Sequence, residues 1–399
     1  MDDVLGSALP AWSTDEAVAL ATVVATRGSA PRPLGASLVV LPDRSVRGSV
    51  SGGCVEGDVY ELAQEVLADG TPVLERYGFS DSDAFAVGLT CGGELDVYVQ
   101  RIDRASFPEL GAVLADIADG RPVAVATVIE HPDPQVRGRR LVVRPAGAGP
   151  APSAPSAPSA ASAASAASAP VAPLAPLAPV VSERADEAVT ADALGLLAAG
   201  DNGVLTYGPD GERLDSGMRV FVHAWAPRAR MIVFGAIDFA AAACRLGAFL
   251  GYEVTVCDAR PVFATRTRFP DAHEVVVAWP HRYLAAERDA GRIDERTVLV
   301  VLTHDAKFDV PVLELALRLP VAYVGAMGSR RTHEDRADRL ARAGVPPDRL
   351  ARLHSPIGLD LGARTPEETA VSIAAEIIAC RWGGSGEPLA GTLGAIHRG

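Results

Sequence analysis

Two kinds of apolar pattern alternate along the first half of the chain. Residues 15–26 form a run rich in Val and Thr, and residues 93–102 alternate apolar with polar side chains, both of which are typical of strands. Residues 55–70 space their apolar side chains three and four positions apart and end on Gly70, which predicts an amphipathic helix. The same pattern predicts a helix over 107–120. The first half is therefore predicted to be a mixed α+β domain.

From residue 229 onward the pattern changes to near-continuous apolar runs separated by helical stretches. The runs cover residues 230–236, 252–260, 273–280, 296–305 and 320–329. Strands without polar alternation are buried on both faces, so these runs predict the parallel sheet of a doubly wound, Rossmann-like α/β domain. Before the last helical stretch, Thr365 is followed by Pro366 and Glu368, which predicts a capping box at its start.

One segment differs from both patterns. Residues 148–182 consist almost wholly of Ala, Pro and Ser, with too few bulky apolar groups to offset the entropy lost on ordering. Because the sequence after it again has the pattern of strands bounded by Gly, Asp and Asn, we place this segment inside a loop of the first domain. The expected organisation is an N-terminal domain over 1–147 and 183–227 with a disordered insertion at 148–182, a Rossmann-like domain over 228–384 and a loose tail over 385–399.

Composition and charge narrow the function. The 37 basic and 50 acidic residues give a net charge of −13, which argues against nucleic acid or an anionic membrane as a main partner. No run of 18 apolar residues and no signal-peptide pattern occurs, so a cytoplasmic protein is expected. The five cysteines are odd in number and form no C-x-x-C pair, which argues against a disulfide framework or a structural zinc site.

The first turn of the Rossmann-like domain resembles a dinucleotide fingerprint with one departure. Gly235 stands at the first glycine of G-x-G-x-x-G/A, Ala240 at the third, and Asp258 follows where an acid binds the ribose. Ile237 replaces the second glycine, which normally lets the backbone approach the pyrophosphate. Asp238 adds a negative charge at the same helix start. These two residues disfavour NAD(P) in its usual pose, and a Rossmann scaffold without nucleotide is the competing interpretation.

A cysteine stands in a glycine turn of the first domain. Cys54 follows Gly52 and Gly53 and precedes the predicted helix, where the helix dipole and the unpaired amides favour a thiolate and would also hold an anion. A lone cysteine is most often a small buried hydrophobe. Flanking glycines favour the alternative, because they occur where the backbone approaches a ligand closely.

A second thiol has similar surroundings. Cys91 is followed by Gly92 and Gly93 and then by a predicted strand, so the two glycine–cysteine turns flank one helical unit and could meet at one end of a sheet. The three remaining cysteines lie in helix or strand patterns and are predicted to be packing residues; they are Cys244, Cys257 and Cys380.

Two further loops follow strands of the Rossmann-like domain. His304 and Asp305 come at the carboxyl end of a parallel strand, where doubly wound proteins build their sites. Gly328 and Ser329 lead into Arg330, and such a loop binds phosphate through backbone amides and a guanidinium group. A solvated helix start is the alternative interpretation for this arginine.

The chain resembles the XdhC/CoxI family in several stretches that occur in the family's order. These are residues 25–40, 48–60, 88–99, 323–331 and 356–379. The resemblance implies a maturation factor that binds molybdenum cofactor, helps it acquire its terminal sulfur and inserts it into a molybdenum hydroxylase of the xanthine dehydrogenase or carbon monoxide dehydrogenase type. It implies Cys54 and Cys91 as candidate contacts to the molybdenum centre, and the hydroxylase apo-enzyme and a cysteine desulfurase as partners.

The resemblance also indicates which functional hypotheses compete. The family's nucleotide turn reads G-A-G-H-V-A, whereas residues 235–240 here read G-A-I-D-F-A. A non-catalytic cofactor chaperone is the leading hypothesis, and a homodimer is the expected assembly. An NAD(P)-dependent oxidoreductase using the Rossmann-like domain and a sulfurtransferase carrying a persulfide on Cys54 are the two enzyme hypotheses.

Overall fold

The computed structural model describes residues 2–28, 30, 32–78, 93–146, 179–213 and 216–393. The chain divides into two compact units, Met1–Pro227 (unit 1) and Arg228–Gly399 (unit 2). Most of the predicted insertion at 148–182 lies outside the described residues. The segments on either side of it contribute strands to the same sheet of unit 1. In the described part of the chain, no helix has the length and apolar character needed to cross a bilayer.

Unit 1 contains two antiparallel sheets. The first has the strand order β3-β2-β1-β5-β4 and comprises β1 (Val18–Arg27), β2 (Ser37–Val40), β3 (Val46–Gly48), β4 (Val73–Tyr77) and β5 (Glu94–Ile102). The second has the order β7-β6-β9-β8 and comprises β6 (Val123–Glu130), β7 (Arg140–Val143), β8 (Gly203–Tyr207) and β9 (Met218–Trp225). The helices of unit 1 are α1 (Asp2–Gly6), α2 (Leu9–Ser13), α3 (Glu56–Asp69), α4 (Leu110–Ala118) and α5 (Glu183–Ala199).

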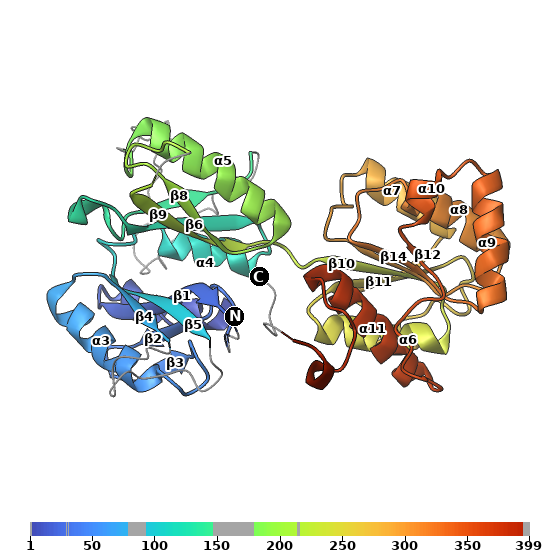
Figure 1. The fold of residues 1–399 in the computed structure, drawn as a ribbon, viewed down its shortest axis with the longest axis horizontal. Helices are drawn as coiled ribbons and strands as arrows, with labels where there is room; N and C mark the ends of the chain where they lie inside the picture. Colours follow the sequence, from blue (N-terminus) through green and yellow to red (C-terminus); the bar gives the residue numbers. More distant parts are fainter. Residues whose placement is uncertain are drawn as a thin grey trace, which may run out of the picture. The chain divides into compact units, whose positions relative to one another are not determined.

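The two sheets pack face to face, with α3 and α5 on their outer faces (Figure 1). α3 buries Val59, Ala63 and Val66 against the outer face of the first sheet. The helix ends at Gly70, which has a left-handed φ of +78°, as the sequence predicts. The inner faces of the two sheets meet each other, so side chains that alternation directs away from the helices are also buried.

Unit 2 is built on one parallel sheet of order β12-β11-β10-β13-β14-β15. Its strands are β10 (Arg230–Phe234), β11 (Glu253–Asp258), β12 (Glu274–Val277), β13 (Val298–Val301), β14 (Tyr323–Ala326) and β15 (Leu353–His354). Helices α6 (Asp238–Phe249) and α11 (Pro366–Trp382) cover one face, and the helices on the other include α7 (Pro280–Asp289), α8 (Ala306–Ala316) and α9 (Arg330–Arg342), as Figure 1 shows. α10 (Pro347–Leu350) precedes β15.

The strand order of unit 2 reverses at β10, which lies between β11 and β13. Loops at the carboxyl ends of strands beside such a reversal diverge and leave a crevice where doubly wound proteins bind ligands. The prediction of a mixed α+β domain followed by a doubly wound Rossmann-like domain is confirmed. The predicted capping box at the start of α11 is also confirmed: Thr365 accepts from the amide of Glu368, whose side chain accepts from the amide of Thr365.

Candidate functional site

The glycine turn of unit 1 connects β3 to α3 through residues 49–55. Gly52 and Gly53 adopt φ values of +81° and +121°, which residues with a side chain rarely adopt. A Cβ at either position would meet no atom within 4 Å. The turn therefore requires glycine for its backbone conformation rather than for space.

The carboxylate of Glu56, the first residue of α3, holds this turn together. It accepts hydrogen bonds from the backbone amides of Val50, Ser51, Gly52 and Gly53 at 3.2, 2.9, 2.9 and 2.8 Å. The hydroxyls of Ser49 and Ser51 donate to the same carboxylate. Amides that converge in this way form the concave arrangement with which many proteins bind phosphate. Here the bound anion is a side chain of the same chain.

The hydrogen bonds keep Glu56 charged. Burial would by itself raise its pKa, but the hydroxyls of Ser49 and Ser51 and the loop amides lower the pKa of Glu56 from 4.5 to about 2. An external phosphate would have to displace this carboxylate to reach the amides. Glu56 was not among the predicted site residues, although an acid in the first turn of a helix directly after a Ser/Gly-rich turn is a recognisable signal.

Cys54 lies between the loop and the core of unit 1. Its amide donates to Ser51 Oγ at 2.9 Å, and the amide of Val55 donates to the same oxygen at 3.0 Å. The half-buried side chain packs against the apolar cluster that α3 forms with the first sheet. The turn therefore holds a thiol at the border of core and surface, on a backbone whose position is fixed by hydrogen bonds.

The predictions made for the other cysteines differ in how the structure tests them. Cys91 and Gly92 lie outside the described residues, so the expectation that their turn lies close to the Cys54 turn stays a prediction. Gly93 stands immediately before β5. Cys244 and Cys257 are fully buried, and burial raises the pKa of each thiol to about 12, as expected of packing residues.

The prediction that Cys380 is a packing residue is wrong, because α11 presents it at the surface. Its sulfur lies 3.9 Å from Nε2 of His354, whose Nδ1 lies 3.1 Å from a carboxylate oxygen of Glu376. Partial burial and the charge of Glu376 raise the pKa of the Cys380 thiol. The group is therefore held as a neutral thiol rather than as a nucleophilic thiolate.

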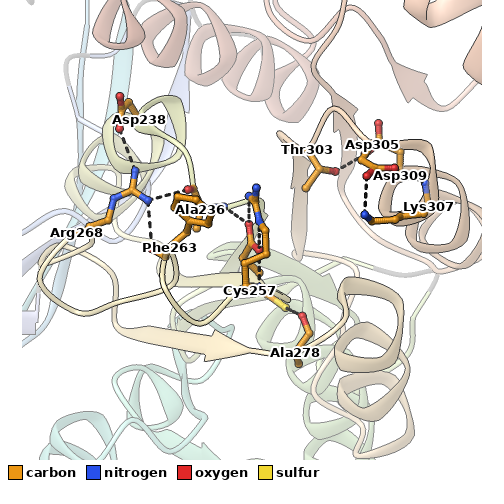
Figure 2. A network of polar contacts seen from close by, with 12 residues as sticks. Ala236, Asp238, Cys257, Phe263, Arg268, Ala278, Thr303, Asp305, Lys307 and Asp309 are labelled. Atoms are coloured by element: carbon orange, nitrogen blue, oxygen red, sulfur yellow. Dashed lines mark hydrogen bonds and ion pairs between the residues drawn. The ribbon is translucent and has the colours of Figure 1, made fainter.

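In unit 2 the candidate nucleotide turn follows β10 (Figure 2). Gly235 has φ +111°, and a Cβ there would lie 2.9 Å from Thr303 Cγ2 and 3.0 Å from its backbone nitrogen. Glycine is needed at this position for both conformation and space. Ile237 is the residue before α6 and has an extended backbone.

Asp258, the predicted ribose-binding acid, already has partners within unit 2. Its carboxylate accepts from the amide of Ala236 at 2.7 Å. It also accepts from the amide and Nε of Arg260, both at 2.9 Å, and from Nη2 at 2.7 Å. Burial would raise the pKa of Asp258, but these hydrogen bonds lower it. The carboxylate therefore stabilises the turn itself.

A loop from farther along the chain crosses this turn. Arg268 donates to the carbonyl oxygen of Ala236 and to Oδ1 of Asp238, both at 3.1 Å, as Figure 2 shows. These two acceptors flank Ile237, which stands at the fingerprint's second glycine. The turn is thus spanned by an arginine that the sequence analysis did not identify, because no local pattern links residue 268 to residue 236.

The other strand-end loops are held by their own caps and one buried arginine. Ser329 caps α9 by accepting from the amide of Thr332 at 3.1 Å, and Arg330 is exposed at the helix start. Arg336, which is 3% exposed, donates to the Met327 carbonyl at 2.8 Å and to Asp309 Oδ2 at 3.0 Å. Arg336 is therefore the guanidinium that ties these loops together.

His304 and Asp305 both lie exposed in the loop after β13. Asp305 caps α8 by accepting from the amide of Lys307 at 3.1 Å, and the two side chains form an ion pair at 2.9 Å (Figure 2). The hydroxyl of Thr303 donates to the buried carboxylate of Asp309, whose pKa burial raises. The carboxyl edge of the sheet therefore carries several charged groups that are paired with one another.

Both halves of the chain match models of one protein family. A model described as the XdhC and CoxI family matches residues 11–78, and one described as the XdhC Rossmann domain matches residues 231–377. The first match contains the turn held by Glu56. The second covers the candidate nucleotide turn and the strand-end loops.

Curated relatives share this organisation over nearly their full length. The chain is 27% identical over 370 residues to a probable xanthine dehydrogenase subunit of Bacillus subtilis, covering 92% of this chain and 94% of the relative. It is 25% identical over 378 residues to the molybdenum cofactor insertion chaperone PaoD of Escherichia coli, covering 95% and 88%. A crystal structure described as a xanthine dehydrogenase from Bacillus halodurans superposes with a TM-score of 0.58 at 23% identity, covering 98% and 97%, and supports the fold.

Proposed function

Because the chain belongs to the XdhC and CoxI family, we propose that it binds molybdenum cofactor as cargo and inserts it into a molybdenum hydroxylase of the xanthine dehydrogenase type. The observation that carries this proposal is the likeness to a molybdenum cofactor insertion chaperone over 95% of this chain, both units included. The turn held by Glu56 adds a physical element, since it places one thiol where a ligand can reach it.

The chemistry of the cargo suits this thiol. Molybdenum cofactor presents soft sulfur and metal atoms together with a phosphate, and soft centres prefer thiolate ligands. Cys54 would contact the soft centre, and Cys91 is proposed as its second contact. The amides of residues 50–53 do not fit a phosphate, because Glu56 already occupies them. The phosphate is therefore expected to bind elsewhere.

The finer steps are also part of the proposal. A cysteine desulfurase would supply the sulfur for sulfuration, the acceptor would be the hydroxylase apo-enzyme, and the chain would act as a homodimer without catalysing a reaction of its own. The NAD(P)-dependent alternative has little support, because Asp258 and Arg268 engage the turn that a dinucleotide would need. A sulfurtransferase would require a persulfide on Cys54.

The test is to purify the full chain from cells that make the cofactor and to measure molybdenum and oxidised-pterin fluorescence per chain. We expect both in the wild type and a loss of about tenfold or more in Cys54→Ser, since a direct metal contact is removed. Cys380→Ser, which alters an exposed thiol of unit 2, is the matched control. If Cys54→Ser carries as much cofactor as the wild type, Cys54 is not a contact to the cofactor. If the wild type carries no cofactor, the chain does not bind molybdenum cofactor as cargo.

A further inference from the structure

The interior between the two sheets of unit 1 is partly polar. In β1 the odd-numbered residues from Ala19 to Val23 pack in the cluster with α3, whereas Thr22 faces the second sheet. Gln100 of β5 and Thr127 of β6 face the same interior. The three polar residues are 4%, 6% and 6% exposed. Burying polar groups costs free energy unless they find hydrogen-bond partners. Thr22 has one in Ser37, whose hydroxyl lies 3.3 Å from its own, and Gln100 Oε1 has one in Arg140.

A cavity lies among these side chains. The volume open to the centre of a water-sized sphere is about 40 Å³, which is room for about three water molecules. Arg140 of β7 and His223 and Trp225 of β9 complete the polar part of the lining. All of these residues belong to unit 1, so the cavity is a feature of one compact body.

Arg140, a partly buried residue, contributes a positive charge and forms no ion pair with a carboxylate in the described part of the chain. It donates to Gln100 Oε1 at 2.5 Å and to the Ser106 carbonyl at 2.6 Å. None of the fifteen described residues that line the cavity is Asp or Glu. The nearest acids that act on it are Asp103, which is paired with Arg101, and Glu109. Burial lowers the pKa of Arg140 to about 10, so the guanidinium is charged at neutral pH.

Other groups add donors without adding negative charge. Thr127 and Gln100 line the cavity with a hydroxyl and an amide, which can donate hydrogen bonds to a ligand. Burial lowers the pKa of His223 to about 3, so its ring is neutral and stacks on Trp225. The guanidinium of Arg140 lies 4.8 Å from the centroid of the Phe107 ring. Water would satisfy the donors, whereas an anion would in addition pair with the charge of Arg140.

We propose that this cavity binds a small oxygen-bearing anion, a carboxylate or an inorganic oxyanion of about three to five heavy atoms. Arg140 supplies the charge, and Gln100 and Thr127 supply directed hydrogen bonds from the first and second sheets. In a chain with a net charge of −13, such a site selects its ligand by these local donors, because the long-range field of the protein repels anions.

The test is to titrate the full chain with sodium formate and, separately, with inorganic phosphate at constant ionic strength. Binding is followed by the fluorescence of Trp225, with Trp225→Phe as the reference, and by the melting temperature. We expect saturable one-site binding and a higher melting temperature with at least one probe. Tighter binding of formate would indicate a carboxylate ligand, and tighter binding of phosphate would indicate an inorganic oxyanion.

Two variants make the test specific. Arg140→Gln removes the charge and should weaken binding about tenfold or more, and Thr127→Val removes a hydroxyl at constant shape and should weaken it about fivefold. Arg47→Gln, an exposed residue of β3, should bind as the wild type does. Thr127→Val preserves the test if Arg140→Gln does not fold. The proposal is overturned if neither probe saturates the wild type, or if Thr127→Val and a folded Arg140→Gln bind with wild-type affinity.

Discussion

The glycine turns that begin α3 and α6 both place a carboxylate of this chain on amides at a helix start, but they obtain it differently. Glu56 follows its turn directly, and its carboxylate accepts from four consecutive amides. Asp258 reaches the amide of Ala236 from the end of the next strand, 22 residues later. The first turn is therefore a local structure, whereas the second exists only once the parallel sheet has formed. Substitutions in the two turns, compared by their effect on the free energy of unfolding, can test this difference.

The largest difference is expected from glycine substitutions. Gly235→Ala forces a side chain into a left-handed backbone and against Thr303, so the free energy of unfolding should fall by about 2–4 kcal/mol. Gly52→Ala has a similar backbone but open space around it, and should cost about 1–2 kcal/mol. Urea unfolding of both variants measures this; equal losses would show that the contact with Thr303 is relieved without cost.

Removing the carboxylate of the first turn should have the next largest effect. Glu56→Ala leaves four amides and two hydroxyls without their acceptor, and hydrogen bonds to a charged group each contribute about 1.5–3 kcal/mol when buried. Since the loop is partly open to water, which replaces some of them, we expect a loss of about 2–3 kcal/mol. Glu61→Ala, an exposed acid of the same helix, is the control. A loss below that of the control would contradict the role assigned to Glu56.

The same carboxylate should make unit 1 sensitive to acid. Its pKa is about 2 in the folded chain against 4.5 ordinarily, so its stabilisation is complete above pH 4.5 and is lost as the pH falls through 4.5 toward 2. After allowance for solvent screening the effect should be at most about 2 kcal/mol. Unfolding of the wild type and of Glu56→Gln between pH 6 and pH 3, about the range in which this group titrates, should converge with acidity. Parallel curves would mean that Glu56 does not titrate in this way.

The smallest effect is expected where Arg268 spans the second turn. The ion pair with Asp238 is largely exposed, so Arg268→Gln should cost less than about 1 kcal/mol. Arg282→Gln, at an exposed position of α7, serves as the reference. A larger loss than in Glu56→Ala, measured by the same unfolding experiment, would reverse the ranking of the two turns.

Much of the fold could be predicted from local pattern. The helix that ends at Gly70 and the capping box at Thr365 depend on residues within one turn of each other, and both occur as predicted. The near-continuous apolar runs predicted the parallel sheet of unit 2, because strands covered by helices on both faces leave few polar positions. The surface position of Cys380 was not predicted, because the apolar periodicity of a helix does not show which of its faces the rest of the unit leaves exposed to solvent.

The candidate site could be predicted only in part. The glycine–cysteine turn and Gly235 are marked by their own sequence, and both occupy turns at helix starts. Arg268 and Arg336 were missed because atoms they bind, the Ala236 carbonyl and the Asp309 carboxylate, lie 32 and 27 residues away along the chain. An arginine far from its acceptor in sequence has no pattern that distinguishes it from a solvated one.

The sequence by itself determined the strands, the helices, their ends and the two glycine turns, because each depends on the conformational preferences and periodicity of neighbouring residues. The tertiary structure decided which groups those turns bind and what lies between the two sheets of unit 1. Gln100 and Thr127 lie on strands of different sheets, and Arg140 of β7 meets them only after the sheets pack. The alternation along the strands directed Gln100 and Thr127 away from the helices, and the packing of the second sheet enclosed them beside the charge of Arg140.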